Sequence, residues 1–151
     1  MSKISVFSLE KRFKQFEKPI FSVAAKLLKI INSDNYYLEI YLADGKTMRF
    51  LNKKFRNKNK TANVLSFNEP SGFLHPELAV RSGMEKTKSL GEIYLNLEDN
   101  ERITGKNVNK SPDENFRLLA HGILHLLGYN HKKKNDKIKM EVLEKKLISE
   151  L

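Results

Sequence analysis

The stretch that decides the fold runs from residue 111 to residue 131 and reads SPDENFRLLAHGILHLLGYNH. Ser111 is a favourable N-cap, Pro112 suits a first helical turn and Glu114 can complete a capping box, so the stretch predicts a helix that begins here. Gly128 suits the C-terminal end of that helix. Between its two ends the helix is apolar on nearly every side, at Phe116, Leu118, Leu119, Ala120, Ile123, Leu124, Leu126 and Leu127. A helix with this pattern is expected to lie buried in the centre of the protein.

Strand and helix patterns alternate in the rest of the chain. Residues typical of strands, several of them alternating apolar and polar, predict strands at 3–9, 36–42, 64–67 and 90–97. Helical spacing predicts helices at 19–31, 47–57 and 98–106, and a last helix that Asn135 caps. Asp44 and Gly45 are expected to form the turn that ends the second strand. Because the chain shows no repeat or linker, we expect one α+β domain over residues 1–151, with a small mixed sheet packed by helices.

Two of the predicted helices carry an apolar stripe that is expected to pack inward. In the helix at 47–57 the apolar stripe consists of Met48, Leu51 and Phe55, and a basic stripe consists of Arg49, Lys53, Arg56 and Lys60. In the last helix the stripe consists of Ile138, Val142, Leu143, Leu147 and Ile148. The basic stripe is left facing outward, where it could meet phosphate groups.

The charge of the chain is strongly positive and unevenly distributed. Lys and Arg number 28 against 18 Asp and Glu, a formal net charge of +10. Between Gly45 and Asn68 there is no acidic residue, whereas this segment contains Lys46, Arg49, Lys53, Lys54, Arg56, Lys58 and Lys60. Such a segment attracts polyanions by counterion release. Two interpretations remain open from charge alone, an ordinary solvated surface and a phosphate-binding surface.

The composition also excludes several classes of protein. Cysteine is absent, so disulfides and thiolate metal sites are excluded and any metal must be held by His, Asp or Glu. The N-terminus has no apolar core followed by a small-residue cleavage site, which excludes a typical secretory signal. The apolar run at 20–31 is about half as long as a membrane span. We therefore expect a cytoplasmic protein that does not contact a membrane.

Three of the four histidines lie within the stretch quoted first, at His121, His125 and His131. At about 100° per residue, the first two lie about 40° apart on one face of the helix, one turn from each other. Gly128 lets the chain turn so that His131 can approach the same point. Unpaired imidazoles on a buried helix would cost free energy, which favours a shared metal ion over isolated core histidines.

Three imidazole ligands leave a fourth position open, which is typical of a catalytic rather than a structural zinc site. A zinc ion in such a site lowers the pKa of bound water and polarises phosphoryl or carbonyl oxygens. In HExxH metalloproteases the residue after the first histidine is the glutamate that acts as general base, but here it is Gly122. The pattern therefore argues against peptide hydrolysis. A glycine inside a helix also suggests that another backbone or a substrate approaches closely there.

The residues from His121 to His131, HGILHLLGYNH, resemble the signature of the YbeY family of bacterial ribosomal RNA maturation endoribonucleases. The resemblance extends to Leu51-Asn52 through Arg56, to NVLSF at 63–67, to LGEI at 90–93 and to Met140-Glu141, in the family's order. These matches cover most of the chain, although the first fifty residues match in pattern only.

The resemblance implies a metal-dependent single-strand endoribonuclease that acts in small-subunit ribosomal RNA maturation and ribosome quality control. It implies one Zn²⁺ per chain on the three histidines, and it places the family's functional arginine at Arg56, where a guanidinium could hold a phosphate. It further implies ribosomal RNA, the small ribosomal subunit and assembly factors such as the Era GTPase as partners. Arg49, Lys53 and Lys60 are candidate nucleic-acid contacts.

The sequence departs from the family pattern in two places. Asn130 stands where the family usually has Asp, and Thr61-Ala62-Asn63 replaces the usual Pro-Thr-Asp. Loss of the Asp would remove a carboxylate that orients a ligand imidazole, although an Asn carbonyl still accepts a hydrogen bond. Two other functions stay open from the residues, a non-catalytic RNA-binding ribosome assembly factor with a structural metal and a hydrolase of small phosphoesters or peptides.

Overall fold

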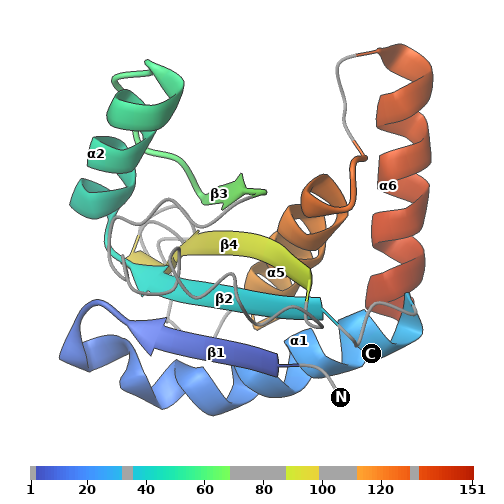
Figure 1. Ribbon diagram of the computed structural model, residues 1–151, viewed down its shortest axis with the longest axis horizontal. Coiled ribbons are helices and arrows are strands. Elements are labelled where there is room, and N and C mark those ends of the chain that lie inside the picture. Colours follow the sequence, from blue (N-terminus) through green and yellow to red (C-terminus); the bar gives the residue numbers. More distant parts are fainter. Residues whose placement is uncertain (1–2, 32–35, 69–87, 99–111, 130–132) are drawn as a thin grey trace.

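The computed structural model describes residues 3–31, 36–68, 88–98, 112–129 and 133–151 (Figure 1). The elements in this part of the chain are β1 (Lys3–Ser8), the 3-10 helix η1 (Lys11–Phe16), α1 (Glu17–Ile30), β2 (Tyr36–Ala43), α2 (Gly45–Arg56), β3 (Val64–Phe67), β4 (Lys88–Asn96), α5 (Pro112–Leu126) and α6 (Lys134–Ser149). The predicted α+β class is confirmed, and so is a strand or helix near each predicted position that falls in the described part. The helix predicted at 98–106 lies outside the described residues, except for its first residue.

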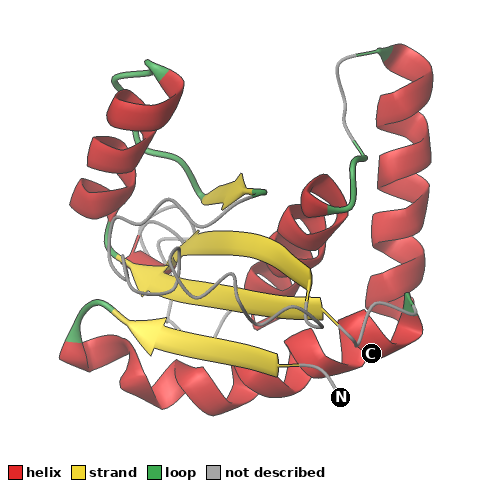
Figure 2. Ribbon diagram, in the orientation of Figure 1, coloured by secondary structure: helices red, strands yellow, loops and turns green. Residues whose placement is uncertain are grey.

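The strands form one four-stranded mixed sheet in the order β1-β2-β4-β3 (Figure 2). β1, β2 and β4 are parallel, whereas β3 runs antiparallel to β4 at the edge. The register pairs Ile40 with Ile93 and Tyr41 with Tyr94. Because side chains alternate along a strand, the isoleucines lie on one face of the sheet and the tyrosines on the other.

Each face of the sheet packs against helices. On one face, Leu38, Ile40, Leu42, Ile93 and Leu95 join side chains of α1 and α5 in the larger apolar cluster. On the other face, Tyr41 and Tyr94 stack at a centroid distance of 4.7 Å, and α2 covers them with Met48 and Leu51. α6 packs on α5 rather than on the sheet. Figure 1 shows the result, with α2 and α6 standing on opposite sides of the molecule.

α2 differs from the prediction at both ends. The helix begins at Gly45 rather than at Thr47, so Asp44, expected in the turn that ends the second strand, is its N-cap: its Oδ1 accepts a hydrogen bond from the backbone N–H of Thr47 at 2.8 Å. The strand does end where predicted. Phe55, expected on the buried stripe, is 39% exposed. It lies in the last turn of α2, where its ring meets that of Phe67 at a centroid distance of 5.4 Å.

The buried face of α6 matches the prediction only in part: Leu147 is buried, and Leu143 and Ile148 pack against the larger apolar cluster. Ile138 and Val142 were expected to pack inward, but they are 50% and 60% exposed. The buried residues are Met140, Glu144 and Leu147. The residue before the helix is Lys133, which makes no side-chain capping hydrogen bond, so the predicted cap at Asn135 is wrong. Within the part of the chain that the structure describes, no helix is both long and apolar enough to cross a membrane.

Candidate functional site

α5 holds two of the predicted ligands side by side. Its buried face packs on the sheet through residues such as Leu119 and Ile123, which leaves His121 and His125 partly exposed on another face. Their Nε2 atoms lie 3.1 Å apart, and the two rings are inclined at 74°. Two nitrogen ligands about 2.0–2.1 Å from a tetrahedral ion must lie about 3.3 Å from each other. The pair therefore fits two positions of a metal site, and the same distance suits a hydrogen bond between the rings.

Gly122 lies between these histidines and faces β4. A Cβ atom at this position would lie 3.2 Å from Cδ1 of Ile93. The close approach predicted from the sequence is therefore made by a side chain of the sheet, not by another backbone or a substrate. The glycine lets α5 lie close to β4, which positions both histidines at the edge of the larger apolar cluster. Gly128, with φ of +102°, ends the helical region as predicted.

Glu144 of α6 contacts His121 on the side of the ring away from His125. Its Oε2 lies 2.9 Å from Nδ1 of His121. Because a carboxylate can only accept, Nδ1 of His121 donates to Glu144, and Nε2 is the ring nitrogen that faces His125. This is the arrangement by which a carboxylate orients a metal-binding histidine. The residues present therefore fit a metal ion, with Glu144 supporting one ligand.

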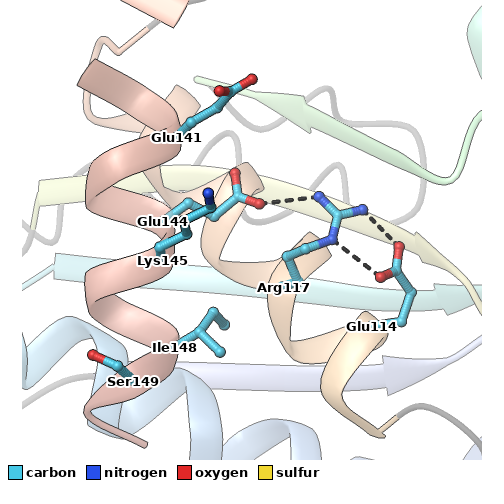
Figure 3. A pocket seen from close by; sticks show the side chains of 7 residues that line it. All are labelled: Glu114, Arg117, Glu141, Glu144, Lys145, Ile148 and Ser149. Carbon is cyan, nitrogen blue, oxygen red and sulfur yellow. Dashed lines mark hydrogen bonds and ion pairs between the residues drawn. The ribbon is translucent and has the colours of Figure 1, made fainter. Parts of the chain in front are cut away.

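Arg117 extends this chain of contacts (Figure 3). Its guanidinium donates to Oε1 of Glu144 at 3.0 Å and to Glu114 at 2.6 Å. Burial by itself raises the pKa of Glu144, but hydrogen bonds from His121 and Arg117 outweigh it, and the pKa is lowered. Glu144 is therefore held as a carboxylate. The contacts lie beside a pocket of about 540 Å³ between α5 and α6, lined by Glu114, Arg117, Glu141, Glu144, Lys145, Ile148 and Ser149.

Sequence reasoning missed Glu144, although a signal for it exists. Glu144 is only 8% exposed and shares a helical face with Met140 and Leu147, at spacings of four and three residues. A carboxylate among apolar residues at this spacing is expected to have a partner, because unpaired buried charges are costly. The signal was hidden because Ile138 and Val142 suggested a different buried face.

Arg56 lies at the C-terminal end of α2, next to β3. Its guanidinium donates a hydrogen bond of 2.6 Å to the carbonyl oxygen of Ser66 and lies 5.3 Å from the ring centroid of Phe67. At the end of β3, the side chain of Asn68 donates to the carbonyl oxygen of Leu126 at 3.0 Å. Leu126 follows His125 directly. β3 thus connects the Arg56 region to the end of α5 that carries the histidine pair.

The other predicted cations lie on the outer side of α2 and in the segment after it. Arg49 donates to Asn59 at 3.1 Å, and the side chains of Lys53 and Lys60 are exposed. Their contacts with nucleic acid stay predictions. His131 lies outside the described residues, so the third ligand stays a prediction too. Among the described residues, no group of three His, Cys, Asp or Glu side chains is arranged to hold a metal ion.

Comparison with known proteins identifies relatives along nearly the whole chain. The family model described as Endoribonuclease YbeY matches residues 3–151. The endoribonuclease YbeY of Bartonella quintana (strain Toulouse) is 34% identical over 142 residues, which cover 89% of this chain and 84% of the relative. That of Wolbachia pipientis subsp. Culex pipiens is 32% identical over 152 residues, 97% of this chain and 92% of the relative. A solution structure of a Thermotoga maritima protein shares the fold, with a TM-score of 0.58 at 24% identity over 97% of this chain and 87% of that one.

Proposed function

Because the chain belongs to the endoribonuclease YbeY family, we propose that it is a metal-dependent single-strand endoribonuclease acting in small-subunit ribosomal RNA maturation and ribosome quality control. The observation that carries the metal dependence is the pair of Nε2 atoms 3.1 Å apart, with Nδ1 of His121 held by Glu144. Its proposed setting is the cytoplasm, where small ribosomal subunits and assembly factors such as the Era GTPase would be its partners.

Each residue has a definite part in this proposal. His121, His125 and His131 would hold one Zn²⁺ per chain, and Glu144, which lies 2.9 Å from Nδ1 of His121, would fix the orientation of that ring so that Nε2 faces the ion. When bound, the ion supplies Lewis acidity toward a phosphoryl oxygen. Arg56 exchanges its hydrogen bond with Ser66 for a phosphate of the RNA, which its planar guanidinium can bind in bidentate fashion and stabilise as charge develops.

The metal site is tested by the metal-to-protein ratio of the purified chain, measured by mass spectrometry. We expect about one zinc per chain, lost in His121→Ala and retained in His75→Ala, which removes the one histidine outside the cluster. Retention of full zinc by His121→Ala would contradict the ligand assignment. Absence of metal from every form, even after zinc is supplied, would leave a basic RNA-binding protein.

The nuclease activity is tested on a single-stranded RNA oligonucleotide. Cleavage should be lost with a chelator, restored by zinc and abolished in Arg56→Ala, while the duplex of the same sequence should resist. The ends of the products separate two chemical routes. A 2′,3′-cyclic phosphate and a 5′-hydroxyl indicate attack by the RNA's own 2′-hydroxyl, whereas a 5′-phosphate and a 3′-hydroxyl indicate attack by water. A linear 3′-phosphate alone does not separate the routes, because it also forms when the cyclic phosphate is hydrolysed.

A second candidate function is a non-catalytic RNA-binding assembly factor, and the contacts of Arg56 favour it. The guanidinium already binds Ser66 and lies over Phe67, which is what a residue that only ties α2 to β3 would do. Under this alternative, Arg56→Ala and His121→Ala would still bind RNA and support ribosome maturation. Loss of maturation in both folded variants would exclude it.

A further inference from the structure

The outer surface of α2 combines exposed aromatic rings with a cation. Phe50 is 50% and Phe55 is 39% exposed. Single exposed apolar residues are common on protein surfaces and need no explanation. These two are distinguished by Lys54, whose Nζ lies 5.7 Å from the ring centroid of Phe50 and 5.4 Å from that of Phe55. One ammonium group thus sits beside both rings.

The charge around these rings defines the kind of partner. α2 reads GKTMRFLNKKFR and contains no acidic residue. All of its cations are exposed, at Lys46, Arg49, Lys53, Lys54 and Arg56. A surface of this kind attracts a polyanion. Aromatic faces interleaved with cations are the combination that binds single-stranded nucleic acids, because bases stack on the rings while the phosphates meet the cations.

The aromatic surface continues from α2 toward the histidine pair. Phe55 meets Phe67 of β3 edge to face, with ring centroids 5.4 Å apart, and Arg56 lies over that second ring. Asn68, the next residue, is hydrogen-bonded to Leu126 beside His125. A strand held on α2 would therefore meet Phe67 and Arg56 before it reaches the end of β3, which Asn68 ties to the C-terminal end of α5. Binding to a membrane surface would not require aromatic contacts that continue from α2 to β3.

We propose that Phe50, Lys54 and Phe55 form a stacking surface for the bases of single-stranded RNA, which holds the strand on the approach to His121 and His125. This inference rests on the proposed function and adds how the substrate is held. Phe50 and Phe55 stack on unpaired bases, and Lys54 moves from the rings to a phosphate. The surface is insensitive to base sequence, because every base has a face that can stack. Paired bases are already stacked in their own duplex, so we expect duplex RNA to bind this surface more weakly than a single strand.

The chain contains no tryptophan, so Phe50→Trp introduces a single fluorescent reporter at the proposed surface. Phe21→Trp is the matched control, because Phe21 is 47% exposed but lies on α1, which packs on the other face of the sheet. We expect a single-stranded RNA 12-mer to quench Phe50→Trp and leave Phe21→Trp unchanged. A 12-mer of the same charge that lacks its bases should bind more weakly and quench neither.

Affinity for the same strands gives the second measurement. Phe50→Ala should weaken the binding of single-stranded RNA about 5- to 100-fold. It should weaken the binding of the strand without bases much less. Phe21→Ala should leave the affinity for both strands unchanged. If the unchanged protein binds and cleaves the RNA but Phe50→Trp is not quenched, the stacking surface is wrong and the nuclease proposal stands. If the unchanged protein binds no RNA, both proposals fail. Quenching or a blue shift with anionic lipid vesicles only would also overturn the RNA assignment.

Discussion

Removing the carboxylate of Glu144 should weaken metal binding without unfolding the protein. Its Oε2 lies 2.9 Å from Nδ1 of His121, and it holds the tautomer that presents Nε2. Partners of this kind are worth about 10- to 100-fold in metal affinity, so Glu144→Ala is expected to fall in that range. Glu144→Gln should lose less, because its amide oxygen still accepts the Nδ1 proton although the charge is gone.

The stability cost of the same change follows from the surroundings of Glu144. Breaking a fully buried ion pair costs about 3–5 kcal/mol. The side chain of Arg117 is 44% exposed, so water can replace the lost carboxylate, and the loss should be nearer the about 1–3 kcal/mol of an unsatisfied polar group. The metal-free variant should therefore remain folded, with a lower unfolding temperature.

Competition with a chromogenic zinc chelator measures the affinity, and the visible spectrum of the cobalt-substituted protein reports on the geometry of the site. The matched control is Glu141→Gln, which makes the same charge change one turn earlier on α6, at an exposed residue of the same pocket. It should leave both readouts unchanged. A Glu144→Ala protein with unaltered zinc affinity and cobalt spectrum would refute the role assigned to the carboxylate.

Three further changes test other parts of the structure. Gly122→Val should destabilise the protein by about 1–3 kcal/mol through overpacking against Ile93; chemical denaturation should show partial rescue by Ile93→Ala, and simple additivity would contradict the contact. Asp44→Ala should cost about 1 kcal/mol by removing the cap of α2. Burial by itself raises the pKa of Asp44, but hydrogen bonds from Thr47, together with Glu10 and the charge of Arg12, outweigh it and lower the pKa. The stability from this carboxylate is therefore present above its unfolded pKa and lost as pH falls through the folded pKa, and Asp44→Asn should keep the cap and flatten that part of the pH profile. Lys53→Ala should lower the slope of log affinity for RNA against log salt by about 1, and an unchanged slope would remove Lys53 from the interface.

Much of the candidate site could be predicted because it is local. His121 and His125 are four residues apart, and once the segment is helical their closeness follows from helix geometry alone. The two ends of α5 could be predicted in the same way, because Pro112 and Gly128 act through the conformation of the local backbone. Glu144 could not be found in this way, because it lies on another helix and only the packing of α6 on α5 brings it to His121.

The differences in α2 and α6 have the same physical origin. Apolar residues occur on more than one side of α6, so its sequence alone does not decide which side is buried. Packing against α5 selected Met140, Glu144 and Leu147 and left Ile138 and Val142 in solvent. In α2, Phe55 fits the apolar spacing but is 39% exposed, and its ring meets only the edge of the Phe67 ring on β3 rather than the core below Met48 and Leu51.

By itself, the sequence determined the order of strands and helices, the central helix and the spacing of its histidines, because these depend on interactions between residues close in the chain. Tertiary structure alone decided that a carboxylate of α6 supports His121, that β4 occupies the space left at Gly122, and that two phenylalanines of α2 face solvent beside a lysine. Those outcomes depend on which surfaces pack together. Periodicity within one helix does not contain that information.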